Sequence, residues 1–274
     1  MCVKKIIYPI LMIGFIFVVL SWKATPSLEL KPEKPEIAST SLTENIPSSS
    51  DLIDEQIQTA FQNTGLEKSK LSYDVFRKAY VGFLNLKATG KIPASASVMS
   101  IADFNMSSKS KRLWIVDIDK EEILLNTWVS HGRGSGGDMA TKFSNINSSH
   151  QSSLGFYVTG EVYYGKHGRS LRLDGMDVGY NHKARERAIV LHGAEYVSAN
   201  TIKSLNRLGL SHGCPAVPLA LTNQIIDLVK DKTVLFIHSS TSSYSSKYLD
   251  EELAGKTLLA GYLENNTDSD YVKL

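Results

Sequence analysis

The stretch Arg207–Pro218, RLGLSHGCPAVP, contains Cys214, the only cysteine that follows the first two residues of this 274-residue chain. Pro215 disfavours helical dihedral angles at the residue before it, so Cys214 is predicted to lie on an extended segment and not at a helix N-terminus. Upstream, the apolar run Ala188–Leu191 predicts a strand, and His192 follows it directly. An imidazole aimed by a strand and a thiol on a loop predict a cysteine–histidine site on a β domain.

Short runs rich in β-branched and aromatic residues follow one another from about Ser97 onward. RLWIVDID and EILLNTWVSHG flank Lys120–Glu121 as the two arms of a hairpin, and SLGFYVTGEVYYG, SLRLDG and TVLFIHS come later. Helical spacing within this part is limited to Ala199–Leu205 and Pro218–Lys230. The pattern predicts a mainly β (α+β) domain over residues 96–240, an antiparallel sandwich or barrel with helical additions.

Residues 1–22 carry two lysines before the uncharged apolar run Ile6–Trp22. As a helix this run would be roughly 25 Å long, at the short end of what spans a bilayer. We therefore expect a signal anchor or a signal peptide, cleavage being left open, and a chain exported to the periplasm with anchoring to the inner membrane as one outcome. In that oxidising compartment an unpaired Cys214 indicates a reactive thiol or an intermolecular crosslink.

The flanking segments differ in composition from the β part. Residues 23–50 are rich in Pro, Ser and Thr and are predicted to form a disordered linker. Residues 51–95 are predicted to be a helical segment, because Asp51–Gln62 and Ser72–Lys87 show helical spacing. Residues 241–274 are predicted to be a polar C-terminal tail, with room for one short helix.

Composition excludes several classes of function. The formal net charge of +2 and the absence of a basic stripe argue against nucleic-acid binding. The seven histidines show no paired ligand spacing, and Cys214 offers one thiolate, so no metal site is expected. A Gly-rich phosphate loop is also absent from the sequence, and we expect no cofactor.

His192 followed by Ser211-His212-Gly213-Cys214 resembles the signature of the L,D-transpeptidases, the cysteine enzymes that crosslink bacterial peptidoglycan. WVSHGRGSG, SSLGFYVTGEVYYGKHGRSLRLDG and ARERAIVLHGAEYVS resemble one branch of that superfamily, in exported proteins of Gram-negative bacteria. The resemblance covers about Ser97 to Ser239, and it implies a transpeptidase-like β fold that acts on peptidoglycan stem peptides.

The resemblance also implies roles for single residues. Cys214 would be the nucleophile and His192 its general base, with the carbonyl of Gly193 orienting the second imidazole nitrogen. The N–H groups of Gly213 and Cys214 would form an oxyanion hole. Ser211 would brace this loop at the substrate site. His212, the second residue of the Ser-His-Gly-Cys motif, is a further substrate-site candidate, with a structural role as the alternative.

Other candidates for substrate binding come from residue chemistry. Guanidinium groups suit the carboxylates of an acidic stem peptide, although such residues also form solvated surfaces. His131 in a glycine-rich loop is a candidate for the cleft, with a plain turn as the alternative. The candidates are Arg172, Arg187, His131 and Tyr164, together with Arg169, Arg185, Tyr157 and Tyr163 as weaker ones.

The chain departs from the family pattern in two places. The stretch between His192 and Ser211 is longer than usual, and Ala216 stands where the family has a polar residue. The leading hypothesis is acyl transfer between stem peptides through a Cys214 thioester. The alternatives are an L,D-carboxypeptidase or hydrolase with the same site, and a non-catalytic cell-wall-binding protein. A papain-like hydrolase is disfavoured, because there the cysteine precedes its histidine and opens a helix.

Overall fold

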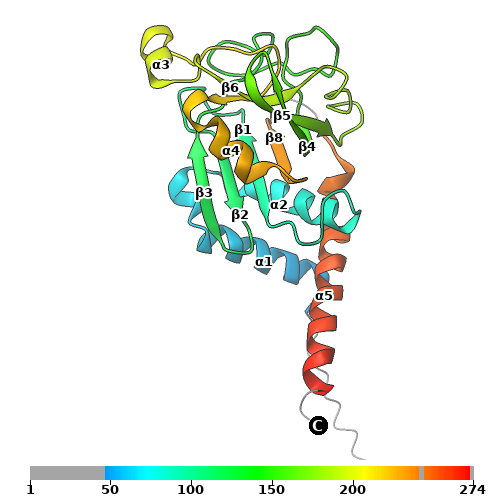
Figure 1. Ribbon diagram of the computed structural model, residues 1–274. Coiled ribbons are helices and arrows are strands. Elements are labelled where there is room, and N and C mark those ends of the chain that lie inside the picture. Colours follow the sequence, from blue (N-terminus) through cyan, green and yellow to red (C-terminus); the bar gives the residue numbers. More distant parts are fainter. Residues whose placement is uncertain (1–46, 241–243, 272–274) are drawn as a thin grey trace, which may run out of the picture. The chain divides into compact units, whose positions relative to one another are not determined.

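The apolar runs become strands, and in the part of the chain that the structure describes eight of them build one mixed sheet (Figure 1). The strand order is β3-β2-β1-β8-β4-β5-β6-β7. β1 pairs with β8 and β6 with β7 in parallel, and the remaining neighbours are antiparallel. The strands are β1 (Val98–Asp103), β2 (Leu113–Asp117), β3 (Glu122–Thr127), β4 (Gly155–Gly165), β5 (Gly168–Gly175), β6 (Val190–Ala194), β7 (Ala216–Pro218) and β8 (Val234–His238).

The coordinates are a computed structural model, which describes residues 47–240 and 244–271. The expected signal segment, residues 1–22, and residues 23–46 of the expected linker lie outside the described residues. None of the helices within the described ranges is both long and apolar enough to cross a membrane.

The two ends of the sheet approach each other directly after β3. The N–H of Ser130 donates a hydrogen bond of 2.8 Å to the carbonyl of Ala216 in β7. This bridge makes the sheet a nearly closed barrel. The prediction of a mainly β domain with helical additions is confirmed, although the sheet is mixed and not antiparallel throughout.

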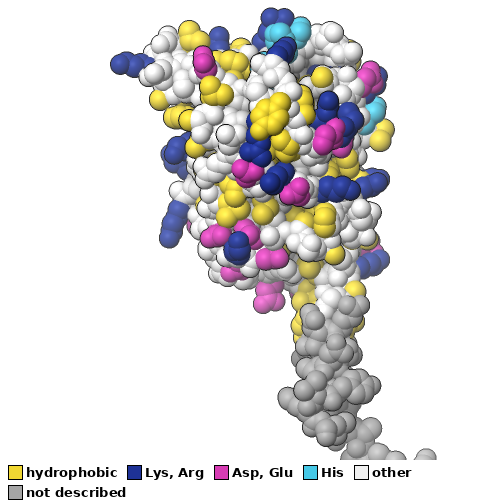
Figure 2. Space-filling model, in the orientation of Figure 1, with side chains coloured by type: hydrophobic (Ala, Val, Ile, Leu, Met, Phe, Trp, Pro, Cys, Tyr) yellow, Lys and Arg dark blue, Asp and Glu magenta, His cyan; other side chains and the backbone are white. Residues whose placement is uncertain are grey.

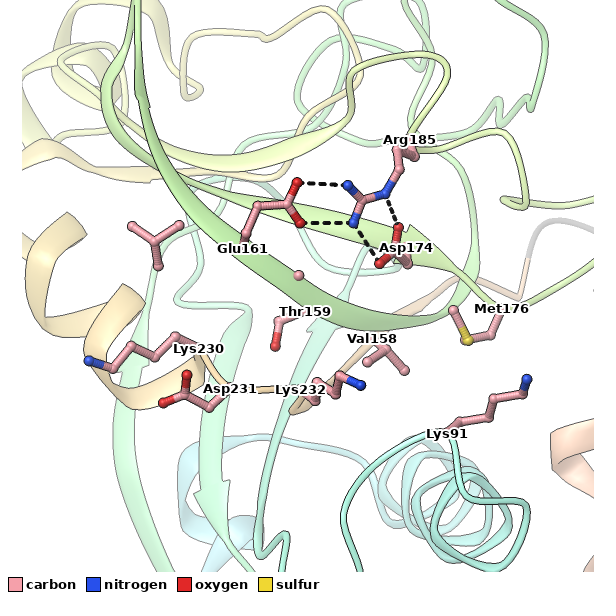
Figure 3. A pocket seen from close by; sticks show the side chains of 12 residues that line it. Lys91, Val158, Thr159, Glu161, Asp174, Met176, Arg185, Lys230, Asp231 and Lys232 are labelled. Atoms are coloured by element: carbon pink, nitrogen blue, oxygen red, sulfur yellow. Dashed lines mark hydrogen bonds and ion pairs between the residues drawn. The ribbon is translucent and has the colours of Figure 1, made fainter.

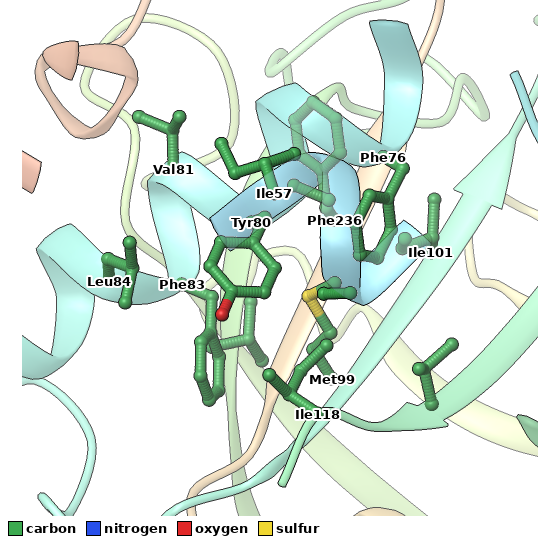
Figure 4. Packing of buried hydrophobic residues seen from close by; sticks show 14 of the residues in the cluster. Ile57, Phe76, Tyr80, Val81, Phe83, Leu84, Met99, Ile101, Ile118 and Phe236 are labelled. Carbon is green, nitrogen blue, oxygen red and sulfur yellow. The ribbon is translucent and has the colours of Figure 1, made fainter. Parts of the chain in front are cut away.

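The strands β2 and β8 are largely apolar along their length, because both of their faces are buried. In β8, Val234 and Phe236 join one hydrophobic cluster, and Leu235 and Ile237 join the other. The first cluster lies between the sheet and the N-terminal helices, and Figure 4 shows Phe76 and Tyr80 of a helix against Met99 and Ile101 of β1. The second cluster is lined by the opposite faces of the same strands and by the helix α4 (Thr222–Val229).

Two helices that precede the sheet pack into the first cluster. Their N-termini are capped by Ser48 and Ser72, whose hydroxyls accept from Asp51 N–H at 3.1 Å and Val75 N–H at 3.4 Å. The second ends shortly before Gly90, whose φ of +66° suits glycine. The helices are α1 (Ser49–Asn63), η1 (Leu66–Ser69), α2 (Tyr73–Ala88), α3 (Ala199–Leu205), η2 (Leu219–Leu221), α4 (Thr222–Val229), η3 (Lys247–Leu249) and α5 (Glu251–Tyr271).

The C-terminal segment differs from the polar tail that its composition suggests. It contains η3 and the long helix α5, and Tyr248 is buried in the first hydrophobic cluster. The buried Asn85 amide on α2 donates to the carbonyls of Tyr248 and Asp250 at 2.9 and 2.7 Å, and Arg77 forms an ion pair with Glu251. A spacing-based argument overlooked this segment because it is anchored by tertiary contacts.

Two element boundaries also differ from expectation. Ala188 has a positive φ of +52°, so β6 begins only at Val190, and His192 lies in the middle of the strand instead of at its end. Pro218 is the last residue of β7 and not the first turn of the following helix, which begins after the intervening η2 turn.

Candidate active site

The imidazole comes from β6, and the thiol comes from the segment that leads into the neighbouring parallel strand β7. His192 of β6 pairs with Ala216 of β7, and Cys214 stands two residues before Ala216, beside Val190. The N–H of Val190 approaches the Cys214 Sγ at 3.5 Å, and the Sγ lies 3.8 Å from the Ala188 carbonyl oxygen. Cys214 is therefore on the extended segment that leads into β7, as Pro215 predicts.

The His192 ring is oriented by its own backbone. Its Nδ1 lies 2.9 Å from the carbonyl oxygen of Gly193, and because a carbonyl only accepts, Nδ1 carries the proton. In the neutral ring Nε2 is then the basic nitrogen. A Cβ at Gly193 would overlap the hydroxyl of Thr222 on α4, so glycine is needed for this close packing.

One cavity of about 400 Å³ is lined by both groups. Its wall is formed by the β4–β5 turn on one side and by the Cys214 loop on another, with no Asp or Glu among the lining residues. The lining includes basic and aromatic side chains, namely Tyr163, Lys166, His167, Arg187, His192, Tyr196 and His212. Such a cavity favours ligands that carry negative charge.

Burial favours the neutral forms of both the Cys214 thiol and the His192 imidazole. It raises the pKa of the Cys214 thiol, an effect that the Val190 N–H and the charges of Arg187 and Lys166 oppose. Burial also lowers the pKa of His192, against the effect of the Gly193 carbonyl.

The Ser-His-Gly-Cys loop is held by internal hydrogen bonds. The hydroxyl of Ser211 accepts from the Gly213 N–H at 3.0 Å and donates to the Cys214 carbonyl at 2.7 Å. Gly213 has a φ of +120°, which only glycine adopts readily. The Gly213 N–H, expected as an oxyanion donor, is thus already engaged, whereas the Cys214 N–H donates to no other residue in the described ranges.

The sheet register separates two adjacent tyrosines. Tyr163 pairs with Ser170, and Ser170 pairs with His192, so these three residues share one face of the sheet. Tyr163 lines the cavity, whereas Tyr164 points to the other face and is 80% exposed. The expectation that Tyr164 belongs to the substrate site is therefore corrected in favour of Tyr163. Tyr157, a weaker candidate, is fully buried in the second hydrophobic cluster.

His131 does not line the cavity. It is completely buried, and its Nδ1 accepts from the equally buried Arg112 at 2.7 Å. Burial and the adjacent guanidinium lower the pKa of His131 to about 4. Its backbone supports the site instead, because its carbonyl accepts from the Ser211 N–H at 3.0 Å.

Among the arginine candidates, one lines the cavity and the others form ion pairs with acidic side chains. Arg187 lines the cavity, but Arg172 pairs with Glu161 at 2.8 Å, and Arg169 pairs with Asp227 at 2.6 Å. Arg185 bridges Glu161 and Asp174, in a separate cavity of about 490 Å³ that contains neither Cys214 nor His192 (Figure 3). Basic and acidic side chains are likewise interspersed over the face drawn in Figure 2.

Three lining residues with polar side chains were not predicted from the sequence: Lys166, His167 and Tyr196. The signal for the first two was the GKHG turn between two aromatic and apolar arms, which predicts a hairpin. What that turn covers depends on the register between β5 and β6, which local sequence patterns do not give. Burial near Cys214 raises the pKa of Tyr196 to about 12. Among the described residues no cluster of three or more His, Cys, Asp or Glu side chains could hold a metal ion.

Residues 67–238 match a family model described as the L,D-transpeptidase catalytic domain. No curated protein matches the chain. Among solved structures, the chain resembles the helical cell shape determining protein Pgp2 from Campylobacter jejuni, at 14% identity and a TM-score of 0.38, over 64% of this chain and 58% of that one. The chain also resembles the L,D-transpeptidase from Mycobacterium smegmatis, at 13% identity and a TM-score of 0.32, over 53% of this chain and 59% of that one. It resembles an L,D-transpeptidase from Stackebrandtia nassauensis at 11% identity and a TM-score of 0.32, over 62% of this chain and 80% of that one.

Proposed function

The chain belongs to the L,D-transpeptidase catalytic domain family, and from this premise we propose that it is a peptidoglycan L,D-transpeptidase with Cys214 as nucleophile. The observation that carries the proposal is that Cys214 and His192 line one cavity, with His192 Nδ1 fixed on the Gly193 carbonyl. A fixed Nδ1–H leaves Nε2 to take the thiol proton, which is the arrangement that cysteine acyl transfer requires.

The proposed first half-reaction forms a thioester. The Cys214 proton passes to His192 Nε2 as Sγ attacks the carbonyl of the diamino-acid residue in a donor stem peptide. In this proposal the Cys214 N–H donates to the oxygen on which charge develops. The C–N bond then breaks, His192 returns its proton to the leaving amine, and the terminal D-amino acid departs.

The second half-reaction regenerates the thiol. An amine of a second stem attacks the thioester carbonyl, His192 takes the proton of that amine, and the thiolate leaves and is reprotonated. Water or a free D-amino acid as the attacking group would give trimming or exchange, which is the L,D-carboxypeptidase alternative. Both outcomes follow ping-pong kinetics, because donor and acceptor react in separate steps.

The non-catalytic alternative loses part of its motivation at Ala216. This residue is completely buried in a hydrophobic cluster with Ala194, Val197 and Leu208. A polar side chain at this position would enter a hydrophobic cluster and would not gather substrate. The missing polar residue therefore does not argue for a wall-binding protein without turnover.

The test is incubation of the protein with disaccharide tetrapeptides. We expect release of D-alanine and formation of crosslinked dimers, both lost in Cys214→Ser. Release without dimers would assign the protein to the carboxypeptidase alternative. Wall binding by Cys214→Ser that equals that of the parent, with no turnover by a parent that is folded and has a free thiol, would establish the non-catalytic one.

Export to the periplasm, with or without an inner-membrane anchor, is part of this proposal. It is supported by the apolar run of residues 1–22 and by the location of peptidoglycan outside the cytoplasm. Mass spectrometry of the N-terminus of protein recovered from cells tests it, because a cleaved form would lack this run and an anchored form would retain it.

A further inference from the structure

The turn between β4 and β5 brings a second imidazole to the site. Gly165 pairs with Gly168, so Lys166 and His167 form the two-residue turn of the hairpin. Gly168 has a φ of +73°, the left-handed conformation that such a turn uses. Both turn residues line the cavity that contains Cys214.

The ring of His167 lies flat on the ring of His192. The ring centroids are 4.2 Å apart and the planes are inclined by 22°, which is a stacked pair. His192 is only 2% exposed, whereas His167 is at the surface. Within the described residues the His167 side chain has no hydrogen bond and no ion pair, so the stack is its contact with the site.

The two contacts of His192 are complementary. The Gly193 carbonyl, 2.9 Å from Nδ1, fixes the ring at one edge and selects the tautomer. It does not shield the face of the ring, and this face is what His167 covers. Without that cover water would reach the imidazole and stabilise its charged form.

We propose that His167 is a positioning residue, which covers the His192 ring and keeps it dry, neutral and in the orientation that Gly193 selects until the thiol proton arrives. The catalytic part of this inference rests on the proposed function. The stacking of His167 on His192 does not depend on that function. His167 touches neither the thiol nor a reacting atom in this account, so it acts through His192.

The charges around His192 agree with this role. Lys166 lies on the same turn, His212 on the Cys214 loop and Arg187 just before β6, and no carboxylate lines the cavity. His167 and Lys166 both lower the pKa of His192, in addition to burial. The imidazolium formed in the proposed reaction therefore has no carboxylate among the cavity-lining residues as a counter-charge, which favours return of its proton.

Three variants test the proposal. His167→Ala removes the cover and the neighbouring charge, whereas His167→Phe removes the charge and keeps a flat ring. Tyr164→Ala is the matched control, because Tyr164 belongs to the same hairpin, faces the other way and is 80% exposed. His167 is itself exposed, so these changes leave the folded core intact.

The primary readout is the titration of His192, followed by NMR of its ring, which requires no substrate. We expect the midpoint in His167→Ala to move to higher pH by about one pH unit. The midpoint in His167→Phe should move by less than half as much, and that in Tyr164→Ala should not move. An unchanged midpoint in His167→Ala, or an equal shift in both His167 variants, overturns the proposal.

The second readout is turnover of the tetrapeptide donor. We expect His167→Ala to lower kcat about tenfold with little change in KM, and His167→Phe to restore most of kcat. A kcat for His167→Ala equal to that of the parent overturns the proposal. If no protein, including the parent, releases D-alanine while the His192 midpoint shifts as expected, the proposed function fails and the positioning role stands.

Discussion

Arg187 provides a sharp test of how the site is held. Its guanidinium donates to the carbonyls of Ser144 and Gln151 at 2.8 and 2.7 Å and to the hydroxyl of Ser149 at 3.3 Å. It also donates to the hydroxyl of Ser153. Sequence analysis assigned Arg187 to substrate carboxylates, whereas four of its contacts go to the loop that precedes β4. We therefore predict that the main effect of Arg187→Met is to lower the free energy of unfolding.

The size of the expected loss depends on which hydrogen-bond acceptors have no donor left in Arg187→Met. The Ser144 carbonyl keeps a hydrogen bond from the Ser153 hydroxyl, but the Gln151 carbonyl loses its donor. Hydrogen bonds from charged groups contribute about 1.5–3 kcal/mol each and are not additive. Because Arg187 is half-buried and water replaces part of the loss, we expect the free energy of unfolding to fall by about 3 kcal/mol.

The assay is urea unfolding at neutral pH, with Arg169→Met as the matched control. Arg169 forms an exposed ion pair with Asp227, and such pairs contribute little, so the control should stay close to the parent. The charge of Arg187 opposes the rise in the pKa of Cys214, so Arg187→Met should slow alkylation of Cys214 as well. An unfolding free energy for Arg187→Met within about 0.5 kcal/mol of the control would refute the reasoning.

Three further outcomes follow from burial and register. Because burial raises the pKa of Cys214 and lowers that of His192, iodoacetamide should alkylate the free protein slowly at pH 7 and faster as the pH rises, while kcat/KM should keep its plateau below pH 6.5. Burial lowers the pKa of His238 from 6.5 to about 4, so the contribution of the neutral imidazole to stability is complete above pH 6.5 and is lost as the pH falls toward 4. In urea titrations over this pH range, the free energy of unfolding of His238→Phe should therefore fall less than that of the parent, by up to about 3 kcal/mol. Tyr163→Ala should raise KM for the donor peptide in steady-state assays, whereas Tyr164→Ala should leave it unchanged, and equal effects would contradict the register.

Local sequence patterns predicted where helices and strands form better than they predicted which of these elements lie next to each other. The helix Ala199–Leu205 and the hairpin around Lys120–Glu121 follow from periodicity and turn residues, and the structure confirms both. The family assignment from the Ser-His-Gly-Cys motif is confirmed by the match over residues 67–238. That match begins before the resemblance at Ser97 and includes α2, whose apolar face shares a cluster with the sheet.

What the sequence could not give is the placement of side chains by tertiary contacts. Whether Tyr163 or Tyr164 faces the cavity depends on the pairing of three strands. Whether His131 is a ligand-binding or a buried residue depends on Arg112, which lies 19 positions away and donates to its ring. For the C-terminal segment, composition does not show that Tyr248 is buried or that α5 extends over Glu251–Tyr271.

The central claim is that Cys214 forms a covalent thioester with the donor, and intact-protein mass spectrometry during turnover tests it most directly. With a tetrapeptide donor and no added acceptor, the protein mass should rise by that of the donor minus D-alanine, and fragmentation should locate the addition on Cys214. The addition should disappear on adding an acceptor amine and should never form in Cys214→Ser. Release of D-alanine with no mass increase in the parent, or an equal increase in Cys214→Ser, would contradict the account.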